Sequence, residues 1–178
     1  MRDRLKRFIP LIAVFLLAPW PIAYAQDYAS AASKNDSIQI EVAEPSVMPS
    51  WHAFGGAIGG VDNPGDLFYI NTNDNPADIM VTLHLTNTNE LSSCYSYLIL
   101  KVGVYVQNDT GEWEPASSND GTTVPDIFIT DRNGRVSFKL PGFARYKVTI
   151  DSGSYYCFAA QTSNGGVSPQ FYLTADPA

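Results

Sequence analysis

Apolar and polar residues alternate strictly along much of the chain, and this period of two constrains the fold more than any other feature. The longest run predicts a strand with one face made by Leu98, Leu100, Val102, Val104 and Val106. Successive side chains of a β-strand point to opposite faces, so such a segment presents one apolar face to a core. No long segment after the N-terminal region shows the 3.6-residue period of a helix. We therefore expect an all-β protein.

Further segments of this kind predict eight to ten strands in all. Alternation or short apolar runs occur at 38–42, 67–70, 81–86, 127–130, 136–140, 146–150, 156–160 and 171–174. Turn formers separate them, namely Asp62–Gly65, Asn73–Pro76, Asn119–Gly121 and Asn133–Gly134. One open sheet would leave its apolar face in water, so these strands predict a two-sheet antiparallel sandwich.

The N-terminal region predicts export. Basic residues at 2, 4, 6 and 7 precede an apolar run from Phe8 to Leu17, and Ala23-Tyr24-Ala25 has the small-x-small pattern of a cleavage site. We interpret residues 1–25 as a signal peptide. Two prolines interrupt its apolar part, which is too short for a spanning helix of about 20 apolar residues. We expect a secreted or cell-surface protein with no membrane span after cleavage.

The remaining chain is long enough for one domain with its own core. Residues 26–36 are small and polar and predict a flexible leader, and 37–178 predict a single β-sandwich. Within it, 43–62 holds four glycines and the apolar residues Trp51, Phe54 and Ile58 without alternation. Two alternatives are open for this long glycine-rich loop: a cap over one end of the sandwich, or a segment through which copies of the chain associate.

The charge is acidic, −7 for the whole sequence and about −10 without residues 1–25, which hold four basic residues and one acidic residue. Phosphate binding needs clustered Lys and Arg, so no nucleic-acid partner is expected. The two cysteines, Cys94 and Cys157, predict one disulfide in an exported protein.

Three stretches resemble known β-sandwich families. Asp151–Cys157 resembles the tyrosine corner of immunoglobulin domains. The resemblance implies a turn that includes 152–154 and a hydrogen bond from the Tyr155 hydroxyl back to the upstream chain. Asp131–Pro141 resembles a hairpin of bacterial surface sandwiches of the collagen-adhesin B-repeat and prealbumin-like kind. Asn63–Asp66 with Ala77–Leu91 is similar to secreted matrix-fibre subunits of the TasA/camelysin type. These resemblances imply an immunoglobulin-like or jelly-roll sandwich, and the last implies a fibre-forming role.

No catalytic residue, metal site or cofactor is predicted. The Asn- and Asp-rich clusters at 62–66 and 71–78 are interpreted as turns rather than calcium loops. Glu112, Trp113 and Glu114 leave two alternatives open. They could form a carbohydrate platform, with the indole under a sugar ring, or an exposed edge strand that its charges protect from pairing.

Together these features predict a secreted, non-catalytic module with a structural or adhesive extracellular role, which includes self-assembly. The alternative is an extracellular carbohydrate-binding module. The expected partner is an extracellular protein, a polysaccharide or another copy of the chain.

Overall fold

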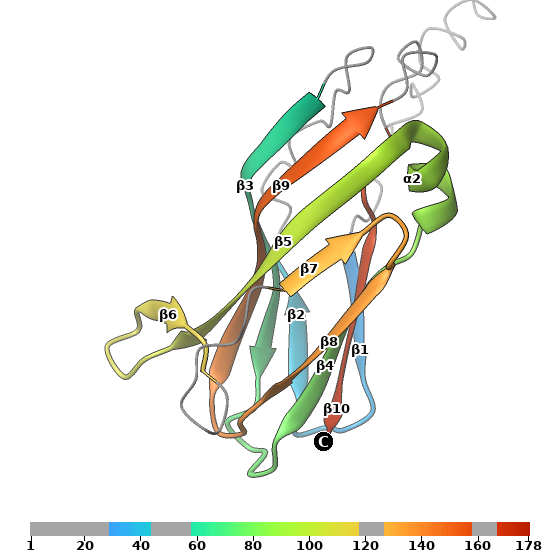
Figure 1. The fold of residues 1–178 in the computed structure, drawn as a ribbon. Helices are drawn as coiled ribbons and strands as arrows, with labels where there is room; N and C mark the ends of the chain where they lie inside the picture. The colour runs from blue at the N-terminus through green and yellow to red at the C-terminus, as the bar shows by residue number, and fades with distance from the viewer. Residues whose placement is uncertain (1–28, 44–57, 118–126, 158–166) are drawn as a thin grey trace, which may run out of the picture.

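The chain folds into two packed β-sheets (Figure 1). The computed structural model describes residues 29–43, 58–117, 127–157 and 167–178. The signal peptide, Trp51, Phe54 and the turn Asn119–Gly121 lie outside these ranges. Ten strands and one short helix are present in the described residues, so the prediction of an all-β, two-sheet sandwich is confirmed.

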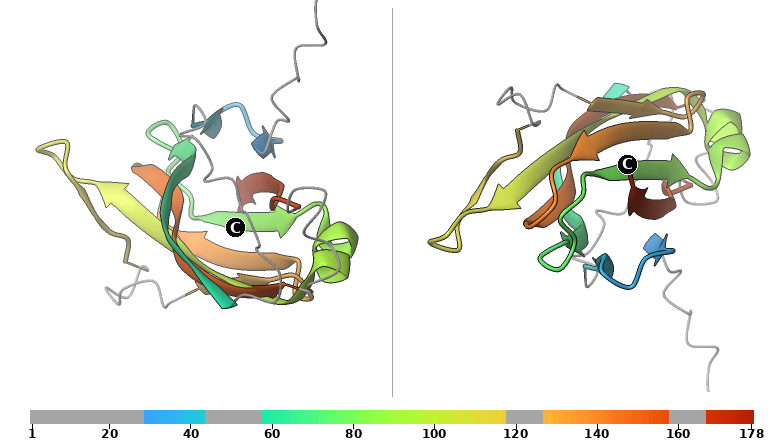
Figure 2. Two further views of the ribbon diagram at one scale, coloured as in Figure 1. Left: turned by 90° about the horizontal axis from the view of Figure 1, so that it is seen from above. Right: turned by 90° about the horizontal axis from the view of Figure 1, so that it is seen from below.

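Sheet A has four strands and sheet B has six. In sheet A the order is β1 (Ala29–Ser33), β10 (Phe171–Pro177), β4 (Ile79–Leu85) and β8 (Arg135–Leu140). In sheet B the order is β2 (Gln39–Val42), β3 (Ile58–Asn71), β9 (Arg145–Cys157) and β5 (Tyr95–Gln107), and both β6 (Trp113–Pro115) and β7 (Ile127–Thr130) pair with β5. The hairpin of β5 and β6 projects beyond the body of the sandwich (Figure 2).

The core lies between the sheets and is built from the alternating positions. On β4, Val81 and Leu83 are completely buried, and on β5 Leu98 and Leu100 are as well. Burial of each such side chain contributes about 1.5–3 kcal/mol relative to exposure. The outward positions of β5 hold Tyr97, Lys101 and Tyr105 as well as the exposed Ile99. The face of sheet B that points away from sheet A therefore carries polar and aromatic side chains that could form a site.

Two expectations for the N-terminal part are corrected. The leader expected at 26–36 is partly ordered, because Ala29–Ser33 forms β1, which pairs with β10 in parallel. The sandwich is therefore not wholly antiparallel. The loop expected at 43–62 ends earlier than predicted, because Ile58–Asp62 belongs to β3 and pairs with β9.

Two predicted turns are wrong, since long strands run through them. Asp62–Gly65 lies within β3, where the pairing with β9 shifts register and Gly65 adopts a φ of 116°. Proline and glycine are common in β-bulges as well as in turns. A bulge also interrupts the hydrogen bonds between two strands and uses unusual backbone dihedral angles. The turn expected at 152–154 lies within β9, which continues to Cys157. There Asp151 is the extra residue between the pairs that Ile150 and Ser152 make with β5.

One helix, α2 (Thr88–Cys94), was not predicted. It is seven residues long and buries only Leu91 and Cys94, which is too few to show a helical period. The side chain of Asn87 anchors its start, because its amide donates to the Ser168 carbonyl (2.9 Å) and accepts from the Gln170 backbone N–H (3.0 Å).

Candidate ligand-binding groove

A row of outward side chains crosses four strands of sheet B. Glu41 on β2 is paired with Tyr69 on β3, and Tyr69 is paired with Lys147 on β9. Lys147 in turn is paired with Tyr105 on β5. Residues that share a register position and a face are neighbours across a sheet. The strand pairing thus places two aromatic rings and two opposite charges side by side on the outer face.

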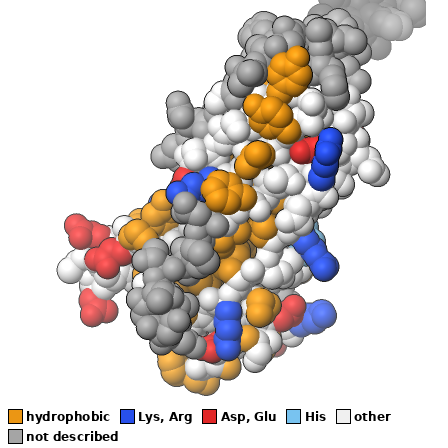
Figure 3. Space-filling model, in the orientation of Figure 1, with side chains coloured by type: hydrophobic (Ala, Val, Ile, Leu, Met, Phe, Trp, Pro, Cys, Tyr) orange, Lys and Arg blue, Asp and Glu red, His pale blue; other side chains and the backbone are white. Residues whose placement is uncertain are grey.

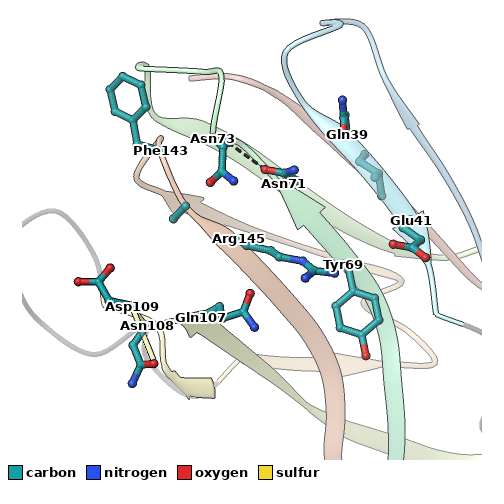
Figure 4. A pocket seen from close by; sticks show the side chains of 12 residues that line it. Gln39, Glu41, Tyr69, Asn71, Asn73, Gln107, Asn108, Asp109, Phe143 and Arg145 are labelled. Atoms are coloured by element: carbon teal, nitrogen blue, oxygen red, sulfur yellow. Dashed lines mark hydrogen bonds between the residues drawn. The ribbon is translucent and has the colours of Figure 1, made fainter. Parts of the chain in front are cut away.

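A second row and three turns complete a groove beside the first. Gln39 pairs with Asn71, and Asn71 pairs with Arg145. The groove has a volume of about 630 Å³ and is lined by Gln39, Ile40, Glu41, Tyr69, Asn71, Asn73, Gln107, Asn108, Asp109, Phe143, Ala144 and Arg145. Figure 4 shows Glu41 and Tyr69 on one side, Asn108 and Asp109 on the other, and Arg145 between them.

Arg145 stacks on the ring of Tyr69. Its guanidinium carbon lies 5.5 Å from the ring centroid, within the range of a cation–π contact. It makes no hydrogen bond or ion pair with any described residue. The N–H groups of this exposed arginine therefore remain available at the middle of the groove.

A network beside the groove fixes the position of Tyr69. Its hydroxyl donates to Asp66 Oδ2 at 2.6 Å, and Lys147 Nζ lies 3.2 Å from Asp66 Oδ1. The hydrogen bond to Asp66, together with partial burial and the charge of that carboxylate, raises the pKa of Tyr69 to about 12. Tyr69 is therefore a neutral hydrogen-bond donor at physiological pH, and its ring is held in one orientation.

Lys147 also holds the indole of Trp113 over the sheet. Its ammonium lies 5.2 Å from the Trp113 ring centroid and 5.4 Å from that of Tyr105. The rings of Trp113 and Tyr69 are 5.9 Å apart, although β5 and β9 separate their strands. Lys147 is paired with Asp66 and does not line the groove, so Arg145 is the one cation among the described residues that line it.

The bulge in β9 places a carboxylate on the same outer face. Asp151 accepts a hydrogen bond from the Tyr105 hydroxyl (2.9 Å) and another from the Thr149 hydroxyl (2.5 Å). The side chain fits because the facing residue is Gly103, where any Cβ would collide with Asp151 and Thr149. The bulge therefore orients Tyr105, which supports the aromatic and cationic cluster.

The structure separates the members of the predicted carbohydrate platform. Trp113 packs against Lys147 and Tyr69, whereas Glu112 precedes β6 and is exposed. Glu114 accepts a hydrogen bond from the Asn108 side chain (2.7 Å) and so stabilises the hairpin. Of the three predicted self-association residues, only Ile58 falls in a described strand.

Cys94 and Cys157 lie close together but are not bonded in the structure. Both are buried, and Tyr95, the residue after Cys94, is paired with Cys157. Burial raises the pKa of the Cys157 thiol, and the neighbouring Cys94 adds to that effect. Over the described residues, no group of three His, Cys, Asp or Glu side chains is placed to hold a metal ion.

The groove residues Glu41, Tyr69, Asn71 and Arg145 were not predicted. They occupy outward positions of strands, where alternation predicts exposure and nothing more. A comparison with models of known protein families and one with curated protein sequences gave no match. Within the described ranges, no helix has both the length and the apolar character needed to cross a membrane.

Proposed function

We propose that the protein is a secreted adhesive module that binds a glycan in the groove on the outer face of sheet B. One observation carries this proposal: five amide side chains surround the stacked pair of Tyr69 and Arg145. They are Gln39, Asn71, Asn73, Gln107 and Asn108. Asn108 is engaged within the hairpin, where its amide binds Glu114, Thr110 and Glu112, so the other four offer the polar groups for a ligand. An amide both donates and accepts hydrogen bonds, as a sugar hydroxyl does, so such a lining suits an array of hydroxyls.

The aromatic side chains support the same class of ligand. A sugar ring has apolar C–H faces, and an ordered aromatic ring can cover one of them while amides bind the hydroxyls. Tyr69 lies in the groove, and Phe143 at its margin is 67% exposed. An apolar small molecule is disfavoured, because sites for such ligands are lined mainly by apolar side chains.

Binding of the mature chain to a panel of neutral and acidic polysaccharides, followed by affinity electrophoresis, tests the proposal. Tyr69→Ala and Asn71→Ala should each weaken binding about tenfold or more, since each removes a direct contact. Tyr69→Phe keeps the ring and should retain most of the affinity. The matched control is Tyr172→Ala on the outer face of sheet A, which should bind normally.

A folded Tyr69→Ala variant with unchanged binding would exclude the groove as the site. Circular dichroism of each variant separates lost binding from lost folding. If no polysaccharide in the panel binds the parent protein, the proposed function is wrong.

Self-association is the second candidate function, and one observation favours it. Among the described residues, the Ile58–Asp62 part of β3 pairs with β9 on one side and with no strand on the other. An edge of this kind can accept a strand from another chain. Deletion of residues 51–57, which leaves β3 complete, should yield a folded monomer at concentrations where the parent assembles in analytical ultracentrifugation. A parent that stays monomeric throughout would rule this candidate out.

A further inference from the structure

We propose that the glycan is acidic, and that Arg145 binds the carboxylate of a uronic acid residue. This inference rests on the proposed function, because it names the ligand class of the same groove. It starts from the guanidinium of Arg145, which is stacked on Tyr69 and has no hydrogen-bond or ion-pair partner among the described residues.

The position of the Arg145 guanidinium over Tyr69 suits binding of a planar anion. The guanidinium carbon lies over the Tyr69 ring at 5.5 Å from its centroid, and the planar fork of N–H donors has no partner among the described residues. A carboxylate can accept two of these N–H bonds in parallel, and such charge-assisted pairs are among the stronger hydrogen bonds in proteins. Asn71 Oδ1 accepts from the Asn73 backbone N–H and Gln107 Nε2 donates to the Gly111 carbonyl, both at 3.0 Å. The Asn71 amide N–H groups and the Gln107 amide oxygen are then available for hydroxyls of the same sugar.

A neutral sugar fits this position less well. When a ligand displaces water from the groove, the guanidinium loses solvation, and a hydroxyl compensates a positive charge only in part. Lys147 cannot share the role, because Asp66 already neutralises it at 3.2 Å. Arg145 lies among neutral amides and beside two carboxylates, Glu41 and Asp109, so the groove can pair one ligand carboxylate but not several.

The surrounding acids limit how highly charged the ligand can be. Glu41 and Asp109 line the groove, and Asp109, Glu112 and Glu114 are exposed on the β5–β6 hairpin. Figure 3 shows acidic side chains gathered there. These carboxylates and the net charge of −7 repel a dense polyanion such as a sulfated polysaccharide or a nucleic acid. The chemistry therefore points to a polysaccharide in which carboxylates are few relative to hydroxyls.

Calorimetric titration of the mature chain with matched pairs of ligands tests this inference. The probes are oligosaccharides of hyaluronan and glucuronoxylan, in which uronic acids alternate with or branch from neutral sugars, each beside a carboxyl-reduced form in which the carboxylate is replaced by a neutral hydroxymethyl group. At least one acidic form should bind about tenfold more tightly than its reduced form, which is the range expected for loss of a charge-assisted pair. That preference should decline with added salt.

Variants connect the preference to Arg145. Arg145→Gln should weaken binding of the acidic form to the level of the reduced form and leave the affinity for the reduced form within about twofold. Arg145→Lys should restore part of the preference, because a lysine keeps the charge but not the bidentate geometry. Glu41→Gln should strengthen binding of the acidic form. The matched control is Arg135→Gln, because Arg135 is exposed at the start of β8 in sheet A. It should leave the affinity for both forms unchanged.

The outcomes separate the two proposals. If acidic and reduced forms bind equally, and Tyr69→Ala weakens both, the groove is a glycan site but its ligand is neutral, and the present inference is overturned. Tighter binding of heparin or of nucleic acid than of any uronate probe also overturns it. If no glycan binds, or Tyr69→Ala has no effect on any of them, the proposed function fails and the inference fails with it.

Discussion

The hydroxyl of Tyr146 donates a hydrogen bond of 2.8 Å to the backbone carbonyl of Pro141, five residues earlier. Tyr146 is the second residue of β9 and is 2% exposed. The bond closes the turn between β8 and β9, where Phe143 has a φ of 56°. A tyrosine corner is thus present in this sandwich, but it is formed by Tyr146 at the strand entrance.

The substitution Tyr146→Phe removes that bond and should lower the free energy of unfolding by about 0.5–1.5 kcal/mol, the usual net value of one hydrogen bond. Urea unfolding of the parent and the variant measures this difference in the free energy of unfolding. Tyr172→Phe, at an outward position of β10, is the control and should be neutral. Equal stability of the parent and Tyr146→Phe would contradict the structural role of this corner.

Tyr155 lies inside a strand. Strand β9 continues through the expected turn, and the Tyr155 ring packs edge-on against Tyr95 with 5.8 Å between centroids. The hydrogen bond predicted for its hydroxyl stays a prediction.

Protein recovered from its native compartment should contain a Cys94–Cys157 disulfide, because the two buried side chains are neighbours at the α2–β9 contact. Its mass without reductant should be two hydrogens below that of the dithiol. The bridge would close a loop of about 63 residues and stabilise the fold by roughly 4 kcal/mol in the chain-entropy model. Two alkylatable thiols in the denatured, unreduced protein would show that no bridge forms.

The glycine at 103 should be hard to replace. A methyl group there would collide with the Asp151 carboxylate and the Thr149 hydroxyl. Gly103→Ala should therefore destabilise the protein by about 1–3 kcal/mol through overpacking and disturb the Tyr105–Asp151 bond. Gly60→Ala in β3 is the matched control, because its nearest neighbouring atom is 3.9 Å away. Thermal unfolding of both variants decides the point, and equal melting temperatures would refute the expectation.

Stability should decline in alkaline solution above the ordinary tyrosine pKa. The pKa of Tyr69 is raised to about 12, chiefly by its hydrogen bond to Asp66, and that of Tyr146 to about 12, chiefly by burial. Burial raises the pKa of Tyr95 as well. In the unfolded chain these groups ionise near 10, so the folded state retains protons that the unfolded state loses. The stabilisation that these protonated tyrosines give the folded state is complete below pH 10 and is lost as pH rises from about 10 to about 12.

Tyrosinate absorbance at 295 nm, recorded beside the melting temperature, measures this effect. A fraction of the tyrosines should stay protonated at pH 11 in the folded protein and ionise upon unfolding. Tyr69→Phe should reduce that fraction. Ionisation of every tyrosine near pH 10 in the folded state would contradict the assignment.

Long-range pairing explains where sequence-based prediction succeeded and where it did not. Alternation in 81–86 and 136–140 predicted β4 and β8, because each strand has one face on the core. The pattern at Asp62–Gly65 was misassigned because the same residues satisfy a turn and a bulge, and only the partner β9 distinguishes them. The groove could not be predicted from the sequence for a similar reason. Glu41, Tyr69 and Arg145 are far apart in the chain, and only the register of β2, β3 and β9 brings them together.

The parallel pairing of β1 with β10 also determines when the protein can fold. Every residue of β1 finds its backbone partner in the stretch Phe171–Ala175, and β10 separates β1 from β4. A nascent chain that has not yet reached β10 can pair β4 with β8 but cannot join β1 to sheet A. Contacts between residues so far apart in the sequence also make folding slow, on the scale of milliseconds to seconds. The topology thus delays completion of sheet A until β10 has been synthesised, after all the strands of sheet B.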